Sequence, residues 1–395
     1  MSDMRQISEF LWEVPKTGGM RVPGRIYANR QLISSIEGDP CVEQVRNVAH
    51  LPGIVKYSLA MPDIHWGYGF PIGGVAAMDA KDGVISPGGV GYDINCGVRL
   101  LSTSLRREDV QNRIRHLLAQ LFRDIPTGVG SHGAIPNLTV PDLNRILSEG
   151  VSRAVEMGYG TTADIPHIEE WGCIPDADPK QVSERAKQRG QKQIGTLGSG
   201  NHFLEIDYVD ELYNDHVAGR LNLSLGQIVI IIHTGSRGLG YQVCDDNLKT
   251  TIRAAERYGI ELPDRQLACA PLKSSEGKAY LGAMRAAANF AFVNRQVIMH
   301  LAEQAFLKAL GLKPHELRMR LIYDICHNIA KFEEHEIDGE KRKVCVHRKG
   351  ATRSFGPGSL ELPAEYRDIG QPVMVPGDMG RYSYLCIGTE KAMTE

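Results

Sequence analysis

The stretch IVIIIHTGSRGLG, residues 228–240, gives the strongest structural signal in the chain. Its first five residues, Ile228–Ile232, are all β-branched and apolar, a pattern that predicts a buried strand. His233 ends this strand, and the glycine-rich sequence after it predicts a turn. A polar side chain is therefore presented where a rigid element meets a loop, which is a common position for ligands and catalytic groups.

The same combination of a strand end or glycine loop with a possible ligand occurs elsewhere in the chain. The residues are Asp93 and Cys96 in GYDINCG, His202 in GSGNHF, and His327 in DICHNI. Carboxylate, thiolate and imidazole together suit Zn, Mn, Fe or Co, and one sulfur can bridge two ions. A histidine or cysteine at such a place is also commonly a buried packing residue, so the structural interpretation stays open beside the metal-binding one.

Length and composition narrow the class of protein. The chain has 395 residues, 42% of them hydrophobic and 23% charged, which excludes a chain that is mainly disordered. The net charge of −2 argues against a surface that coats nucleic acid generally, although a local basic groove is compatible with it. The absence of a CxxC pair, of an apolar secretory segment and of any apolar run of about 18 residues predicts a cytoplasmic protein outside the membrane.

Glycine is frequent, with 42 residues, and its clusters separate short apolar stretches that indicate strands. Helical periodicity covers residues 104–122, an Asp-Pro pair predicts a helix over 178–189, and the Ala-rich region 275–310 predicts a long helix. Asp338-Gly339 predicts a hairpin turn. With no internal repeat and no linker, these elements predict one interlocked domain of mixed strands and helices.

Two further segments carry side chains suited to phosphate or nucleotide binding. KRKVCVHRKGATR, residues 341–353, is rich in Arg and Lys that can contact phosphates, although a solvated hairpin rim would have the same composition. PGDMGRYSY, residues 376–384, is a glycine-rich turn that could hold a nucleotide. The candidates for RNA or phosphate contact are Arg189, Lys192, Arg237, Arg348, Lys349 and Arg353.

Seven long motifs occur in a fixed order along nearly the whole chain. They are PDIHWGYGFPIGGVAA (62–77), GGVGYDINCGVR (88–99), GTLGSGNHFLE (195–205), HTGSRGLG (233–240), CHN (326–328), HRKGATR (347–353) and PGDMGRYSY (376–384). Together they resemble the RtcB family of RNA-splicing ligases. The resemblance implies an enzyme that uses GTP and Mn²⁺ to join an RNA 2′,3′-cyclic-phosphate or 3′-phosphate end to a 5′-hydroxyl end, in tRNA splicing or RNA repair.

The resemblance also implies a fold and a set of site residues. The fold would be α+β, a single large ligase domain over residues 1–395 with a β-rich mixed-sheet core carrying the metal ligands and helices packed outside. Asp93, Cys96 and His202 would bind one manganese ion, and Cys96, His233 and His327 the other. The implied GMP contacts are Asn201, His202, Phe203, Leu204, Glu205, His327, Asn328, Pro376, Gly377, Asp378, Met379 and Ser383.

Several alternatives remain open beside this assignment. Asp63 and His65 in the PDIH motif are catalytic candidates for proton transfer, or they could support the ligands or the loop structure. A metal-dependent phosphoesterase or cyclic phosphodiesterase would use the same ions with water as the nucleophile. A non-enzymatic RNA-binding subunit would use the basic segment and a structural metal. For a ligase, an archease-like activating partner is a further possibility.

The resemblance implies one departure at the C-terminus. Family members continue to a His-Gly-Ala-Gly-Arg segment whose histidine forms the covalent GMP adduct, whereas this chain ends at Glu395 with no histidine in that motif. Asp378 also stands where Ser or Thr is expected. We therefore expect a ligase domain that lacks the family's C-terminal segment and retains the metal ligands.

This expectation predicts that the chain binds Mn²⁺ but forms no covalent enzyme–GMP, because a nucleotidyl transfer needs a nucleophile aimed at the α-phosphate. Incubation with α-labelled GTP and Mn²⁺, followed by denaturing electrophoresis, measures the adduct. A labelled band at the mass of the chain would show the expectation to be wrong.

Overall fold

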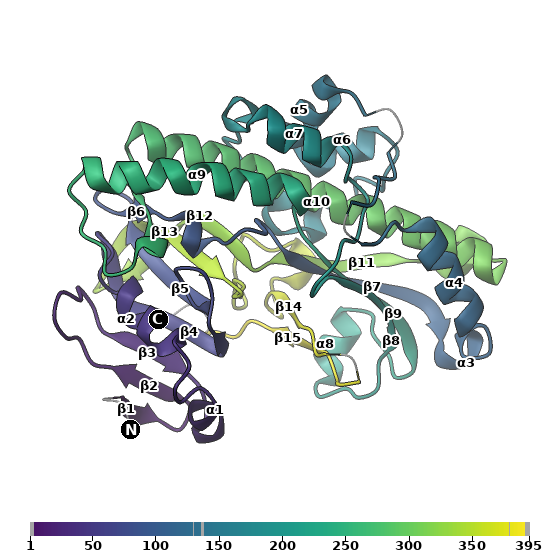
Figure 1. Ribbon diagram of the computed structural model, residues 1–395. Helices are drawn as coiled ribbons and strands as arrows, with labels where there is room; N and C mark the ends of the chain where they lie inside the picture. The colour runs from purple at the N-terminus through teal and green to yellow at the C-terminus, as the bar shows by residue number, and fades with distance from the viewer. Residues whose placement is uncertain (1–3, 129, 136–137, 379, 392–395) are drawn as a thin grey trace.

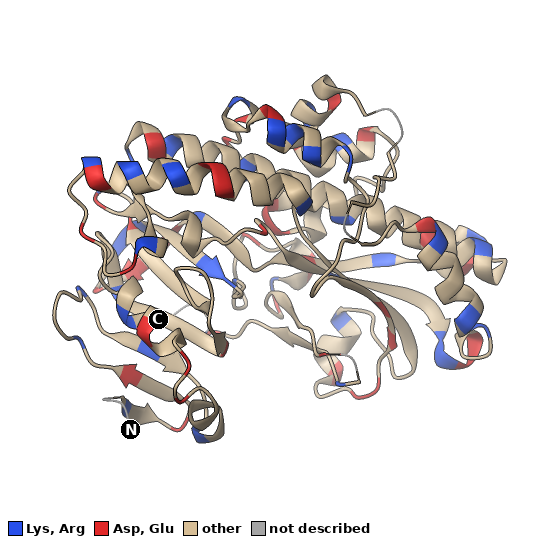
Figure 2. Ribbon diagram, in the orientation of Figure 1, with Lys and Arg blue, Asp and Glu red and all other residues tan. Residues whose placement is uncertain are grey.

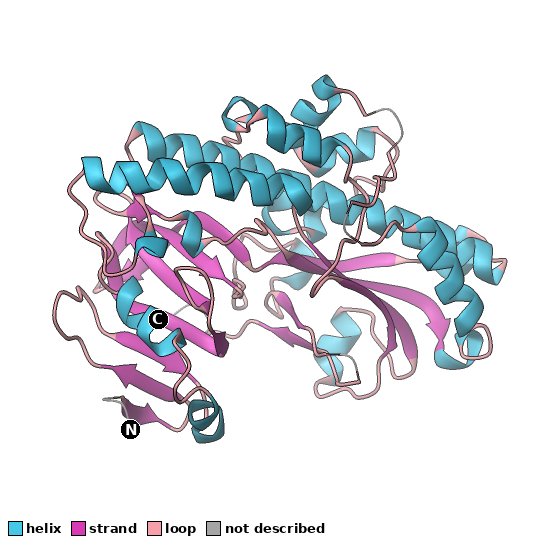
Figure 3. Cartoon of the chain, in the orientation of Figure 1, coloured by secondary structure: helices cyan, strands magenta, loops and turns pink. Residues whose placement is uncertain are grey.

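The computed structural model describes residues 4–128, 130–135, 138–378 and 380–391, which form two larger sheets and two small two-stranded ones (Figures 1 and 3). The α+β class predicted from the sequence is confirmed. The long helices α9 (Arg237–Arg257) and α10 (Ser275–Leu310) lie over the sheets, and α10 runs along both of the larger ones. Within the described ranges, no helix is both long enough and apolar enough to cross a membrane.

The larger sheet has seven strands in the order β1-β2-β3-β4-β5-β13-β12. The strands are β1 (Arg5–Ser8), β2 (Leu11–Val14), β3 (Gly24–Tyr27), β4 (Ile54–His65), β5 (Ile72–Asp79), β12 (Asn328–Ile337) and β13 (Glu340–Lys349). Asp338 and Gly339 form the predicted hairpin turn between β12 and β13, and both have positive φ, 53° and 84°. An Asp-Gly pair suits this turn because both of its central residues need positive φ.

The smaller sheet has four antiparallel strands in the order β11-β7-β9-β8. They are β11 (Arg320–Cys326), β7 (Gly97–Arg106), β9 (Gln227–Thr234) and β8 (Phe203–Tyr208). The register pairs Gly97 with the last residue of β9 and with the last residue of β11. Because Cys96 precedes β7, His233 lies near the end of β9 and His327 follows β11, all three are brought to one end of this sheet.

The apolar run that predicted a buried strand is β9, and both of its faces are covered. Ile230 and Ile232 belong to the apolar cluster that includes the side chains of α10. Val229 and Ile231 belong to a second cluster, which contains Tyr366 from the C-terminal part of the chain. Burial on both faces explains why apolar residues are continuous here instead of alternating with polar ones.

Shorter elements connect and cover the two sheets. They are α1 (Arg30–Ser35), α2 (Cys41–Val48), β6 (Val84–Ile85), η1 (Pro87–Gly89), α3 (Arg107–Val110), α4 (Ile114–Asp124), α5 (Val140–Glu149), α6 (Val151–Glu156), η2 (Ile165–His167), η3 (Glu169–Gly172), η4 (Pro179–Gln181), α7 (Glu184–Gln191), α8 (Asp215–Arg220), η5 (Arg265–Leu267), β10 (Ala270–Pro271), α11 (Pro314–Leu317), η6 (Ala364–Tyr366), β14 (Pro372–Val375) and β15 (Tyr384–Ile387).

Two predicted helices begin later than the sequence pattern indicates. In the stretch 104–122, β7 continues to Arg106 because that residue still pairs with β9, and the helical part is divided into α3 and α4. In the stretch 178–189, Asp178 caps only the short turn η4, where its side chain accepts a hydrogen bond from the backbone. Ser183 supplies the N-cap of α7, so the helix starts after it.

α10 matches the helix predicted from the Ala-rich region, and Ser274 caps its first turn. Arg295 in its middle is fully buried and donates to Asp324 Oδ1 of β11 over 2.8 Å. Asp324 Oδ2 also accepts from Arg99 Nε of β7 over 2.7 Å, and these side chains are fully buried too. The Asp324 carboxylate, between the two guanidinium groups, thus joins α10 to β7, which follows Cys96, and to β11, which precedes His327.

Removal of this carboxylate should destabilise the protein strongly. Asp324→Asn leaves two buried guanidinium groups without a counter-charge, and we expect a loss of about 3–5 kcal/mol in the free energy of unfolding. Denaturant-induced unfolding measures it. The control is Asp368→Asn, whose partner Arg220 forms an exposed ion pair, and it should leave the unfolding midpoint almost unchanged. Equal effects of the two substitutions would contradict this account of the core.

Candidate metal centre

Five possible ligands converge at the end of β7, β9 and β11. Cys96 Sγ lies 3.3 Å from both His202 Nε2 and His233 Nε2. His202 Nε2 lies 2.6 Å from Asp93 Oδ2, and His233 Nε2 lies 3.3 Å from His327 Nε2. The donor atoms form two groups, Asp93-Cys96-His202 and Cys96-His233-His327, and within each group all atoms lie within 4.8 Å of one another. Cys96 belongs to both groups.

Short hydrogen bonds hold the loop before β7 against the turn after β11. The backbone N–H of His327 donates to Cys96 O over 2.9 Å. The side-chain amide of Asn328 donates to Asp93 O over 3.1 Å, and its backbone carbonyl accepts from Asn95 N over 2.7 Å. The ligands from these two segments are therefore positioned as one unit.

A single amide on α10 positions the other two ligand loops. Asn294 Oδ1 accepts from the backbone N–H groups of Gly195 and Thr196, over 2.8 and 3.2 Å. Its Nδ2 donates to Gly235 O over 3.2 Å. Asn294 thus joins the loop that carries His202 to the turn that follows β9.

Burial shifts the pKa of three of the five side chains. Burial, assisted by the neighbouring imidazole of His327, lowers the pKa of His233 to about 2, and burial lowers the pKa of His327 to about 4. Both imidazoles are therefore neutral at pH 7 and offer lone pairs. Burial raises the pKa of Cys96 well above its usual value. Cys96 Sγ and His327 Nε2 each lie 3.3 Å from His233 Nε2, so the three donor atoms could share one divalent cation. Such a cation would stabilise Cys96 as the thiolate.

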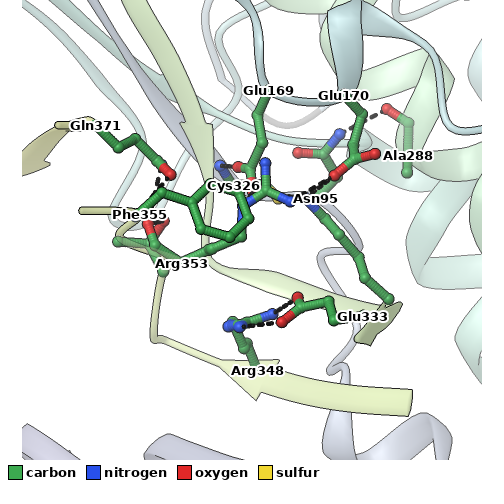
Figure 4. Close-up of polar contacts among 12 residues, drawn as sticks. Asn95, Glu169, Glu170, Ala288, Cys326, Glu333, Arg348, Arg353, Phe355 and Gln371 are labelled. Atoms are coloured by element: carbon green, nitrogen blue, oxygen red, sulfur yellow. Dashed lines mark hydrogen bonds and ion pairs between the residues drawn. The ribbon is translucent and has the colours of Figure 1, made fainter. Parts of the chain in front are cut away.

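A cluster of buried charges lies behind the turn that carries His327 (Figure 4). Glu169 Oε2 accepts from the backbone N–H of Cys326 over 2.7 Å, and its other oxygen pairs with Lys331. Glu170 Oε1 pairs with Lys331 over 3.0 Å and with Arg353 over 2.8 Å. Glu170 has a positive φ of 54°, an unusual conformation that aims its carboxylate inward. The cluster fixes the backbone directly before His327.

Three of the predicted RNA contacts belong to the interior. Arg348 forms a two-pronged ion pair with Glu333, with Nη2 and Oε2 3.0 Å apart (Figure 4). Arg353 is part of the charge cluster, and the ammonium of Lys349 donates to two backbone carbonyls. All three cations are buried, so they are not the exposed phosphate contacts that the basic composition indicates. Burial lowers the pKa of Lys349 to about 8.

The other three predicted cations lie near the start of α9. Arg237 is the first residue of that helix, and its Nη1 lies 2.9 Å from His202 Nδ1. Arg189 Nη1 donates to Gln242 Oε1 over 3.2 Å, and Lys192 is exposed. Along α9, Lys and Arg are intermixed with Asp and Glu, as Figure 2 shows. The role of the three cations as RNA or phosphate contacts stays a prediction.

The implied nucleotide contacts fall in separate parts of the structure. Residues 201–205 lead into β8, where the Phe203 ring meets the His233 ring edge-on with centroids 5.2 Å apart. Ser383 Oγ accepts from Gly377 N over 3.0 Å within the turn between β14 and β15. Met379 lies outside the described residues. In the described part of the chain, no hydrogen bond joins this turn to the five ligands.

Asp63 and His65, the candidates for proton transfer, lie at the end of β4. Both side chains are exposed, and His65 Nδ1 lies 2.7 Å from the backbone carbonyl of Asp63. Neither side chain hydrogen-bonds to the five ligands among the residues described. Their position therefore leaves the two interpretations from the sequence open.

The sequence analysis missed the residues that hold the ligands in place. Asn294, Arg295 and Asp324 sit within apolar stretches, and a polar residue inside a buried run is a signal that could have identified all three. Glu169 lies outside such a run, and its partner Cys326 is distant in the sequence, so no local signal marks it.

Comparisons with known proteins identify the family to which the chain is similar. The family model described as tRNA-splicing ligase RtcB matches residues 44–395. A tRNA-splicing ligase RtcB of Archaeoglobus fulgidus is 53% identical over 394 residues, which are 99% of this chain and 81% of that protein. Proteins of the same name from Thermococcus kodakarensis and Nanoarchaeum equitans are 52% and 47% identical, and the matches cover 82% and 81% of their lengths.

If the two groups hold two cations, loss of the shared sulfur should affect both. We expect that Cys96→Ala abolishes tight binding of two Mn²⁺ ions, whereas His327→Ala, which removes a ligand of one group, leaves one. Isothermal titration calorimetry gives the stoichiometry. Cys41→Ala, a buried cysteine in a separate apolar cluster, is the control and should still bind two ions. Unchanged binding by the Cys96 variant would contradict the arrangement.

Glu169 should act on metal binding through the backbone it holds. Glu169→Gln removes the charged acceptor of Cys326 N, and we expect Mn²⁺ affinity to fall about tenfold to a hundredfold. Glu333→Gln also removes a buried carboxylate from an arginine, but Glu333 does not bond to the backbone beside a ligand. Equal losses of affinity in the two variants would mean that buried charge, not positioning, is responsible.

The same carboxylate should contribute to stability in a defined pH range. Burial raises the pKa of Glu169, but the cations of Lys331 and Arg353 outweigh it and lower the pKa from 4.5 to about 2. A carboxylate whose pKa is lowered by folding stabilises the protein at pH values above its pKa in the unfolded state. This stabilisation is lost as the pH falls towards 2. Thermal unfolding of Glu169→Gln should therefore depend less on pH between about 5 and 2 than that of the parent chain. Identical pH profiles would contradict the assignment.

Proposed function

The chain belongs to the RtcB family of tRNA-splicing ligases, and we propose that it forms the GTP- and Mn²⁺-dependent centre that joins RNA ends. Residues 1–395 would act as one ligase domain on RNA with 2′,3′-cyclic-phosphate or 3′-phosphate ends and 5′-hydroxyl ends. The observation that carries the proposal is the meeting of two three-atom donor groups at one sulfur. A cytoplasmic location, a role in tRNA splicing or RNA repair, and an archease-like activator belong to the same proposal.

The donor set indicates how the residues would divide the work. Asp93, Cys96 and His202 would hold one ion, and Cys96, His233 and His327 the other. Two bound cations supply charge neutralisation at a phosphoryl group and align its attacking and leaving oxygens. The hydrogen bonds of Asn294 and Asn328 keep the ligand loops in place, so that the ligand atoms need little rearrangement on binding.

Nearby side chains would bind the nucleotide and the RNA phosphates. Arg237 presents its guanidinium beside His202 at the N-terminal end of α9, where it would bind a phosphate. Residues 201–205, His327 with Asn328, and the turn 376–383 would contact GMP. Asp63 and His65 remain the candidates for moving a proton.

Binding of GTP tests this function without requiring the complete reaction. We expect that the protein binds labelled GTP in equilibrium dialysis when Mn²⁺ is present and not when it is replaced by a chelator. His202→Ala, which removes both a candidate metal ligand and a candidate nucleotide contact, should abolish binding. Equal binding of GTP with Mn²⁺ and with the chelator would contradict the proposal.

The same preparation separates a ligase from a phosphoesterase. An RNA oligonucleotide with a 2′,3′-cyclic phosphate is incubated with the protein and Mn²⁺ in the absence of GTP. Two products of hydrolysis are measured: the ring-opened phosphomonoester and inorganic phosphate. The ligase assignment predicts neither product, whereas steady formation of either one without GTP would favour the phosphodiesterase or phosphoesterase.

A further inference from the structure

Three tyrosine rings and one guanidinium form a contiguous group, called the stack below, in which one pair of rings is stacked and one pair meets edge-on. The rings of Tyr92 and Tyr241 are stacked, with centroids 4.8 Å apart and planes inclined by 25°. Tyr68 meets Tyr92 edge-on, with centroids 5.6 Å apart. The guanidinium carbon of Arg189 lies 5.3 Å from the centroid of Tyr241. The stack joins four segments that are distant in the sequence.

This stack lies next to the candidate metal centre. Tyr92 directly precedes Asp93, whose Oδ1 accepts from Ser236 N over 3.1 Å at the start of α9. Tyr241 follows Arg237 by four residues on α9, so the two side chains share one side of the helix. The aromatic rings therefore begin one residue away from one candidate ligand and run along the first turns of the helix that carries Arg237.

The rings are not packed as a closed core. Tyr241 is 48% exposed, and Tyr68 and Tyr92 are only partly buried. Among the described residues, no hydrogen bond engages the hydroxyl groups of the three tyrosines. A buried tyrosine normally satisfies its hydroxyl inside the protein, whereas these rings meet solvent with both ring surface and hydroxyl groups available.

Positive charge lies at one end of the stack. Arg189 contacts the ring of Tyr241, and Arg237 precedes Tyr241 by one helical turn on α9. Both acids that follow on α9 have partners: Asp245 pairs with Lys249 over 3.7 Å, and Asp246 accepts from Ser183 Oγ over 2.7 Å. Aromatic faces with neighbouring arginines are the elements that bind single-stranded bases and their phosphates.

The geometry points to a base-stacking platform formed by Tyr241, Tyr92 and Arg189, which binds an unpaired nucleotide of the RNA next to the reacting end. This platform rests on the proposed function and extends it, because the metal centre would bind the terminal phosphate of the RNA and the platform would bind the nucleotide next to it. Stacking tolerates any base, so the platform would hold RNA ends without reading their sequence.

Tyr241→Ala tests the platform. Alanine favours the helix, and the side chain is half-exposed, so α9 should stay folded. Fluorescence anisotropy with a labelled single-stranded oligoribonucleotide, in the presence of Mn²⁺, measures affinity. We expect binding to weaken about tenfold, with an unchanged dependence on salt because no charge is removed. Tyr241→Phe, which keeps the ring, should bind as the parent does.

Two controls identify the cause of any loss. Tyr258→Ala removes a tyrosine of similar exposure, 43%, at the other end of α9 and should have no effect. An oligonucleotide that is abasic at the positions nearest its end should bind the Tyr241→Ala variant and the parent equally. Unchanged RNA binding by the variant, or an equal loss for the normal and the abasic strand, would overturn the platform. Neither outcome concerns Mn²⁺-dependent GTP binding, which tests the proposed function separately.

Discussion

The pairing of β7 with β9 and β11 is the constraint on which the rest of the structure depends. Its register places Cys96, His233 and His327 at one end of three adjacent strands, although they are far apart in the sequence. A shift by one residue would turn every side chain of a strand to the opposite face. Both faces of β9 are buried, each in a different apolar cluster.

Buried ion pairs also hold the segments that carry the candidate ligands in place. Asp324 between Arg99 and Arg295, and Glu169 beneath Cys326, lie directly behind the ligand segments. Buried ion pairs add little net stability, because desolvation offsets their attraction. We infer that these pairs specify geometry instead, because each ties a segment next to a candidate ligand to the surrounding fold and would leave an uncompensated charge if that contact were lost.

The sequence predicted the fold class and the side chains that come together, but not the strand order that brings them together. The five candidate ligands were identifiable because each follows an apolar strand or a glycine loop, and the long helix α10 was identifiable from its Ala-rich composition. The strand order and the buried position of Arg348 were not, because both depend on pairing between distant segments. Local composition made Arg348 a surface cation, but its pairing with Glu333 places it inside.

The central claim is that one sulfur serves two cations. Crystals grown with Mn²⁺ and measured near the manganese absorption edge would locate bound ions directly by anomalous scattering. The account predicts two anomalous peaks on either side of Cys96 Sγ, one beside Asp93 and His202 and the other beside His233 and His327. A single peak, or peaks that do not share the sulfur, would contradict it.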